Sequence, residues 1–394
     1  MKMWVYIIRR ALLLVPVIIG VMTITFVIVS QMPTSTRLLS YFGPSKTGYQ
    51  PTVPCSQLNP MLNGTCSNPT YARDVHILGL DRPLPVQWGI YLYNSLTLNW
   101  GTTDPHSAAS THFALTGAAP VTTVLSYFLP YTLELAAISL FLILVLAIPI
   151  GNYSAVYRNR PLDQGARVLS FSGFALPGFL LASGLLLLAT TASGSGLECN
   201  NLSFHYYDWV GSWPPLACWP GGDYPSWIGP YLETSPTGFP TADALIHGNF
   251  YMAGQSVYRL LLPALTIAYG AVAVVLRFVR NSMLEVMNLD FIRTARAKGV
   301  AESTVIRRHA GRNSLNVTVT VLGLTFASFI GGFPVVELVF GLRGVGLLLA
   351  YSIQPSYDFG LIFGTTLLFT IIVVLANIIV DILYAYLDPR VRLG

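Results

Sequence analysis

The chain has 394 residues, of which 53% are hydrophobic and only 10% are charged, and its formal net charge is +5. Soluble domains usually carry about 25% charged residues, so this composition is typical of a membrane protein. It argues against a soluble enzyme, a disordered chain and a nucleic-acid-binding domain, and no nucleic-acid partner is expected.

Hydropathy predicts an all-α, polytopic membrane protein with six transmembrane helices. Each helix needs about 20 mostly apolar residues to cross roughly 30 Å of hydrocarbon. The first apolar run is too long for a cleaved signal peptide and no small-x-small cleavage site follows it, so we interpret it as a retained span. The predicted spans cover residues 11–31, 131–156, 168–192, 260–284, 317–340 and 359–387.

The basic residues indicate which side of the membrane each connecting segment faces. With the N-terminus in the cytoplasm, sixteen of the 22 Lys and Arg residues fall on the inner side. This asymmetry predicts that both termini are cytoplasmic. The expected organisation is a first helix at 1–32, an outer loop at 33–130, helices two and three at 131–193, a second outer loop at 194–258, and helices four to six at 259–394 with an inner segment at 285–313.

All four cysteines fall in the two long outer loops, Cys55 and Cys66 in the first and Cys199 and Cys218 in the second. Three pairings are formally possible, and four free thiols are an alternative. Sequence proximity in an oxidising exterior favours the local disulfides Cys55–Cys66 and Cys199–Cys218.

Glycosylation sequons begin at Asn63 and Asn201, beside cysteines on the predicted outer side. Such triplets also arise by chance, so they support an exterior location only weakly. Four of the chain's seven tryptophans lie in the second loop. Stacked aromatic rings can bind sugars, lie at the membrane interface or form a small disulfide-bonded core, and we favour the last two.

The inner segment between the fourth and fifth predicted spans is rich in helix formers and positive charge. Its pattern predicts a short helix, a turn at Gly299 and a second helix that leads into the fifth span. Asp290 is a candidate N-cap for the first helix. Such a hairpin could lie on anionic lipid or dock into a cytoplasmic partner.

Two motifs in this segment, RTARAKG at 293–299 and RRHAGRN at 307–313, resemble the coupling loop of ABC importer permeases of the peptide/nickel branch. The resemblance continues through LGLDRPLPVQW at 78–88, LPYTLELA at 129–136, VELVFGLRGVG at 336–346 and a C-terminal NIIVDILYAYLDPRVR at 377–392. The chain departs from the family pattern at 316–317, where Asn-Val replaces an apolar residue followed by proline. Both outer loops are also longer than is usual.

The resemblance implies a type I ABC importer permease for peptides. Its partners would be a second homologous permease in a heterodimer, two cytoplasmic ATPase subunits, an extracytoplasmic solute-binding protein and membrane lipid. The chain contains no GxxxxGK[ST] phosphate loop, so ATP hydrolysis is expected in the partner subunits. No catalytic residue, cofactor or metal site is expected.

The resemblance and the residue chemistry give three sets of candidate residues. Glu134, Glu337 and Asp381 are ionisable groups near the membrane, and we interpret the first and last as structural partners of Arg or backbone donors. A helix break at Gly331-Gly332 and Pro334 suggests an outer gate, with candidates Phe333, Glu337, Gly344 and Gly346. The ATPase-coupling candidates are Asp290, Arg293, Ala295, Arg296, Lys298, Gly299, Glu302, His309 and Arg312.

Other functions stay open at this point. The same branch also moves nickel and, in archaea, oligosaccharides, and the aromatic second loop leans towards sugar. An ion-coupled secondary transporter would be expected to show paired acids in mid-span and inverted repeats, and neither is visible. An intramembrane enzyme would need a nucleophile–base pair or paired mid-span aspartates, which the sequence lacks.

Overall fold

The computed structural model describes residues 3–35, 37–38, 52–54, 65–105, 107–113, 115, 117, 119–192, 237–314, 318, 321–323, 325, 333–354 and 357–387. The chain divides into two units. Unit 1 comprises Met1–Ala11, Pro130–Gly344 and Val373–Gly394, and unit 2 comprises Leu12–Leu129 and Val345–Ile372.

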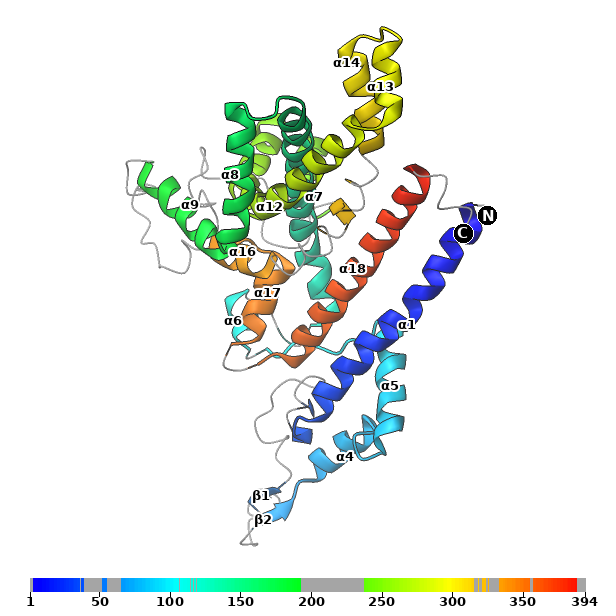
Figure 1. The fold of residues 1–394 in the computed structure, drawn as a ribbon. Helices are drawn as coiled ribbons and strands as arrows, with labels where there is room; N and C mark the ends of the chain where they lie inside the picture. The colour runs from blue at the N-terminus through cyan, green and yellow to red at the C-terminus, as the bar shows by residue number, and fades with distance from the viewer. Residues whose placement is uncertain are drawn as a thin grey trace. The chain divides into compact units, whose positions relative to one another are not determined.

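The described residues are mainly helical (Figure 1), as the sequence predicts. The one described sheet pairs β1 (Thr52–Pro54) with β2 (Thr65–Ser67) in an antiparallel manner. The helices are α1 (Met3–Ser30), α4 (Pro69–Ile77), α5 (Leu84–Leu96), α6 (Ala108–His112), α7 (Val121–Val156), α8 (Pro161–Ala175), α9 (Gly178–Ala192), α11 (Pro240–Ile246), α12 (Phe250–Met287), α13 (Asp290–Ala297), α14 (Glu302–Thr304), η2 (Val305–Gly311), α16 (Phe333–Phe340), α17 (Val345–Ser352) and α18 (Phe359–Leu387).

Three described helices, α7, α12 and α18, are long and apolar enough to cross a membrane. They coincide with the second, fourth and sixth predicted spans. Two bent pairs, α8 with α9 and α16 with α17, bring the number to five if each pair is one broken span. The third predicted span corresponds to the first pair. The first predicted span lies in α1, where only the shorter stretch Val15–Ser30 is apolar among the described residues, and much of 317–340 is not described, so the count of six spans stays a prediction.

Helix α7 begins at Val121, ten residues before the start that hydropathy predicts, and it continues through Pro130. Glu134 therefore lies within this helix instead of opening it. Its side chain is buried, and Oε1 accepts a hydrogen bond from the backbone N–H of Thr241 at 3.3 Å. A backbone donor from α11 thus partners this acid.

In unit 1, α12 packs against α7 and α8 through glycines that let the helix backbones approach closely. A Cβ on Gly173 of α8 would overlap the side chain of Ala273. A Cβ on Gly151 of α7 would lie 2.8 Å from the side chain of Val279. Both sites exclude larger residues, because packed helices this close have no room for a side chain.

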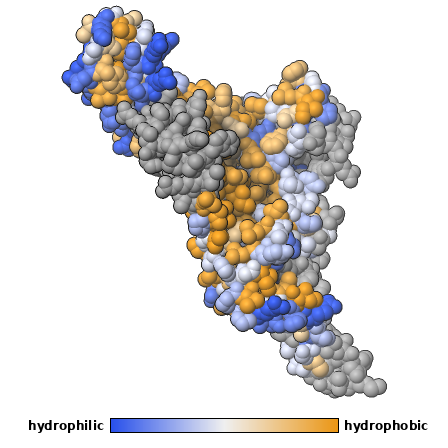
Figure 2. Space-filling model, turned by 90° about the vertical axis from the view of Figure 1, so that its right-hand side faces the viewer, coloured by the Kyte–Doolittle hydropathy of each residue, from blue (hydrophilic) through white to orange (hydrophobic). Residues whose placement is uncertain are grey.

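Large apolar side chains also lie on the outer surfaces of the long helices. Phe141 of α7 is 62% exposed, Phe171 of α8 is 70% exposed and Leu375 of α18 is 52% exposed. The face drawn in Figure 2 shows broad apolar areas, whereas hydrophilic residues gather on the α13–α14 segment at the top. Such exposed apolar surfaces are expected in contact with lipid tails.

Unit 2 is held together by hydrogen bonds between segments far apart in the sequence. The Arg37 guanidinium donates to Gln87 Oε1 at 2.6 Å, and the Trp88 indole donates to Thr23 Oγ1 at 3.1 Å. The buried Asp358 carboxylate caps α18 by accepting from the Leu361 N–H at 3.0 Å. It also accepts from the Asp104 N–H at 2.8 Å and from Ser107 Oγ at 3.1 Å.

Candidate functional site

The inner segment forms a helical hairpin, which we define as residues 289–311, after the end of α12. Helix α13 ends at Ala297, and Gly299 then adopts φ +75°, a left-handed conformation that suits glycine. The second arm is α14 followed by η2, a π-helix. The predicted sequence of helix, glycine turn and helix is confirmed.

The predicted N-cap of α13 is wrong. Leu289 occupies the cap position, and no side chain caps the helix. Asp290 is the first helical residue, and its carboxylate accepts a hydrogen bond from Arg293 at 3.3 Å. A negative charge in the first turn still interacts favourably with the helix dipole.

The hairpin has a small apolar core of its own. Ile292 and Ala295 of α13 pack against Val305 and Ala310 of η2, and this cluster continues to Met283 of α12. Ile292, Val305, Ala310 and Met283 are fully buried. Ala155 at the end of α7 completes the cluster. The hairpin is therefore packed onto the ends of two long helices, and Ala295 faces inward.

The remaining coupling candidates lie on the hairpin surface, except Arg312, which directly follows the hairpin. Arg296 and Glu302 bridge the two arms through two hydrogen bonds, Nη2 to Oε1 at 2.6 Å and Nε to Oε2 at 3.1 Å. This contact holds the pKa of the Glu302 carboxyl below its ordinary value. Lys298 and Arg312 are exposed and His309 is partly buried, so most of the charge faces away from the core.

The structure adds two apolar residues that the sequence analysis did not select. Leu289 is 48% exposed and Phe291 is 41% exposed at the start of α13. They flank Asp290 in the sequence, and neither belongs to the internal core of the hairpin. Their position beside the charged motif could have identified them from the sequence, since large exposed apolar residues outside a membrane span often mark a protein–protein contact.

A buried acid near the hairpin was also missed. The Asp163 side chain of α8 is fully buried and forms salt bridges with Arg280 of α12 at 2.8 Å and with Arg167 at 2.5 Å. It also accepts from Ser154 of α7 and from the Asn159 N–H at 2.9 Å. Asp163 thus connects α7, α8 and α12 within two turns of the helix end that carries the hairpin.

Two of the gate candidates touch each other directly. The Glu337 side chain of α16 is fully buried and accepts a hydrogen bond from Thr132 Oγ1 of α7 at 2.8 Å. A Cβ on Gly344 would overlap the Glu337 carboxylate. Phe333 is buried at the start of α16, and Gly346 is buried in α17. The side chain of Asp381 lies outside the described residues, as do Cys55, Cys199, Cys218, Asn63 and Asn201.

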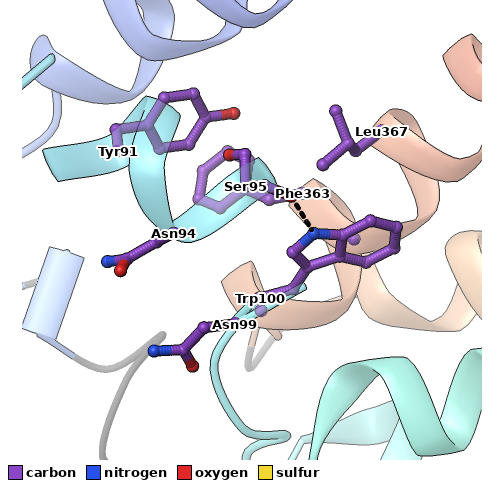
Figure 3. Close-up of a pocket in the computed structure, with 9 residues that line it drawn as sticks. Tyr91, Asn94, Ser95, Asn99, Trp100, Phe363 and Leu367 are labelled. Carbon is purple, nitrogen blue, oxygen red and sulfur yellow. Dashed lines mark hydrogen bonds between the residues drawn. The ribbon is translucent and has the colours of Figure 1, made fainter. Parts of the chain in front are cut away.

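Each unit has a cavity of its own. In unit 1, a groove of about 980 Å³, including its open mouth, lies among α8, α9, α12 and α16. In unit 2, a small pocket lies between α5 and α18, with a volume of about 400 Å³ that includes open solvent and an enclosed part of about 30 Å³ (Figure 3). Figure 3 shows Asn94 and Asn99 at the left, Leu367 at the right, Phe363 near Ser95 between them, and the Trp100 indole, which donates to the Ser95 carbonyl at 3.0 Å.

Neither cavity contains a catalytic set of residues among those described, and no group of three or more metal-ligating side chains occurs in this part of the chain. These features are typical of a membrane subunit: long apolar helices, grooves between them and a basic hairpin that a partner protein could bind. A family model described as the inner membrane component of binding-protein-dependent transport systems matches residues 147–393. The chain belongs to this family.

Similar proteins extend the likeness to the N-terminal part. The probable D,D-dipeptide transport system permease protein of Escherichia coli (strain K12) is 34% identical over 317 residues, covering 80% of this chain and 83% of that protein. The oligopeptide transport system permease protein of Bacillus subtilis (strain 168) is 31% identical over 387 residues, covering 98% and 99%. The dipeptide transport system permease protein of Alkalihalophilus pseudofirmus is 29% identical over 391 residues, covering 99% and 100%.

The family identifies the chain as a multi-pass membrane permease of an ABC importer. Family members are the membrane subunits, and they work with ATPase and substrate-binding partners. The family match begins within α7, so it includes the hairpin, the Asp163 contacts, the groove of unit 1 and the gate candidates.

Proposed function

We propose that this permease imports di- or oligopeptides and forms half of the translocation pathway with a second, homologous permease. The supporting observation is that three relatives, aligned over 80% to 99% of this chain, are peptide permeases by name. None of the three is named for oligosaccharides or nickel, and all are bacterial rather than archaeal. Membership of a binding-protein-dependent family also argues against an ion-coupled secondary transporter.

The hairpin is the proposed contact with a cytoplasmic ATPase subunit. It has the rigidity that mechanical coupling needs, because its core is packed onto α12 and α7. Leu289 and Phe291 offer apolar anchors, and Arg293 and Lys298 offer charge beside them. Ala297 is exposed, and its small side chain would let the backbone of a partner approach. Ala295 instead packs in the internal core of the hairpin.

Motion of the hairpin would reach the membrane helices through Asp163. Its bonds to Arg280, Arg167 and Ser154 join α12 to α8 and α7, so these helix ends should move as one body. At the other end of the pathway, Glu337 and Gly344 form a tightly packed turn after α16. We propose that this turn, with Phe333 and Gly346, belongs to the outer gate.

The proposed topology keeps both termini in the cytoplasm and both long loops outside. All four cysteines fall in the two proposed outer loops, which supports an oxidising compartment for these loops. Non-reducing peptide mapping by mass spectrometry would test the pairings, and loss of a glycan on treatment with a glycosidase would test the sequons. The proposed exterior features are the disulfides Cys55–Cys66 and Cys199–Cys218 and glycosylation at Asn63 and Asn201.

The decisive experiment purifies the tagged permease from its native membrane in mild detergent and identifies the proteins that accompany it. We expect a second permease, ATPase subunits and a solute-binding protein, with ATP hydrolysis that short peptides stimulate and oligosaccharides or Ni²⁺ do not. Stimulation by an oligosaccharide alone would refute the peptide assignment. Recovery of the chain alone, even after crosslinking through Lys298, would refute the coupling function.

A hairpin variant separates docking from folding. Phe291 is 41% exposed, and covering that part of a Phe side chain stabilises a complex by about 1 kcal/mol. Phe291→Ala should therefore weaken ATPase binding about fivefold. Phe141→Ala on α7 is the matched control, because its ring is 62% exposed far from the hairpin in sequence. Equal binding by the two variants would contradict the proposed docking surface.

A further inference from the structure

The groove of unit 1 is apolar, with a few oxygen atoms in its wall. Its sides are formed by residues such as Phe179 of α9, Ile267 and Val274 of α12 and Val336 of α16. Among the described lining residues the only ionisable group is the phenol of Tyr269. About 390 Å³ of this groove can hold solvent-sized molecules, which is within the range for small-molecule sites, so a short peptide segment fits.

The hydroxyl groups in this wall donate their protons inside the protein. Thr266 Oγ1 donates to the Leu262 carbonyl one turn earlier at 3.0 Å. Tyr269 Oη donates to Ser172 Oγ at 2.6 Å, and Ser172 Oγ donates in turn to the Leu169 carbonyl at 3.0 Å. A hydroxyl has one proton and two lone pairs, so Thr266 and Tyr269 present only acceptor capacity to a ligand.

A backbone carbonyl adds to this acceptor set. In a continuous helix the Gly173 carbonyl would accept from the N–H of residue 177, but residue 177 is a proline and has none. The break between α8 and α9 falls at this point. Gly270 faces the carbonyl, and a Cβ there would lie 3.9 Å from the Gly173 oxygen. The missing side chain leaves space beside the oxygen.

We infer that the groove selects its cargo by accepting hydrogen bonds from backbone N–H groups, through Tyr269, Thr266 and the Gly173 carbonyl. This inference rests on the proposed peptide function and names the wall that recognises the peptide. A ligand N–H group can donate a hydrogen bond to these wall oxygens. A ligand group that can only accept leaves the wall oxygens without a hydrogen bond and is repelled by their lone pairs. A broken helix that lines a cavity is where a membrane protein can offer such carbonyls.

The test uses the complete transporter, with its partner permease, ATPase subunits and binding protein, in proteoliposomes. The two probes are trialanine and its analogue in which an ester oxygen replaces the amide N–H of the second residue. The measured quantity is the ratio of their initial uptake rates. The binding protein also discriminates between the probes, but its contribution is the same for every permease variant, so a change in the ratio comes from the permease.

Tyr269→Phe and Thr266→Val each remove one acceptor and keep the shape of the side chain. We expect each to lower the preference for trialanine about two- to tenfold, the effect of one hydrogen bond. Thr366→Val is the matched control, because the Thr366 hydroxyl makes the same kind of bond to the Ile362 carbonyl at 2.7 Å and does not line the groove. Peptide-stimulated ATP hydrolysis verifies that each variant is assembled.

An unchanged ratio in both groove variants, or an equal change in the Thr366→Val control, would overturn the inference and leave the peptide function intact. Failure of the wild-type transporter to take up trialanine, with active ATPase subunits, would refute the peptide function and this inference with it.

Discussion

The packing of the hairpin predicts the effect of truncating Ile292. This side chain is fully buried among Ala295, Val305 and Ala310. Changing Ile292 to Ala removes three carbon atoms, worth about 2.4 kcal/mol at 0.8 kcal/mol per buried methylene, before any term for the cavity left behind. Measured Ile→Ala substitutions in cores cost about 2–5 kcal/mol, so a value near 3 kcal/mol is expected here.

Amide hydrogen exchange of the permease in lipid nanodiscs measures this cost locally. A loss of about 3 kcal/mol should raise exchange in α13 about a hundredfold, because each 1.4 kcal/mol is a factor of ten. Exchange in the middle of α7 should stay unchanged. The control is Arg293→Ala, since Arg293 is on the same helix and its side chain is 72% exposed. Unchanged protection of α13 in Ile292→Ala would refute the conclusion that the hairpin has its own core.

Three further predictions follow from the buried and bridging groups. Asp163→Asn should lower the free energy of unfolding by about 3 kcal/mol, because it leaves Arg280, whose side chain is only 15% exposed, without its counter-charge, and thermal unfolding in detergent will measure it. Gly344→Ala should reduce transport sharply without impairing ATPase binding, since its Cβ would overlap the Glu337 carboxylate; normal transport kinetics would contradict this packing. The Arg296–Glu302 bridge should stabilise the hairpin turn above pH 4.5, the ordinary Glu pKa, and lose this effect as the pH falls through the lower pKa of the folded state. The bridge is exposed, so its contribution is at most about 1 kcal/mol, and Glu302→Gln should abolish the pH dependence of exchange at the turn.

The sequence predicts much of the membrane portion because hydropathy and length alone determine it. Helices α12 and α18 coincide with predicted spans, since each has an unbroken apolar run. Hydropathy predicts a later start for α7 than the structure has, because the first turns at 121–130 contain polar residues and Pro130, and the helix continues through this proline. Proline is tolerated in membrane helices when neighbouring groups satisfy the freed carbonyl.

The hairpin was predicted from its motif and its glycine, both local features. The contacts of Asp163 with Arg280 and of Glu337 with Thr132 were not predictable, because each joins residues more than a hundred positions apart. Hydropathy also gave no signal for the helices α4, α5 and α6, which are short and contain polar residues. Pairing partners of buried polar groups depend on tertiary packing, which a single sequence does not reveal.

The Asp358 carboxylate has a consequence for the order in which the protein is made. Its hydrogen bonds reach Asp104 and Ser107, which leave the ribosome some 250 residues before it. Asp104 and Ser107 therefore lack this hydrogen-bond partner until α18 begins to be made. Chains that stop before residue 358 would lack the Asp358 carboxylate, so the Asp104 N–H and the Ser107 hydroxyl would lose this acceptor. Unit 2 thus gains these buried hydrogen bonds only once residue 358 has been made, late in synthesis.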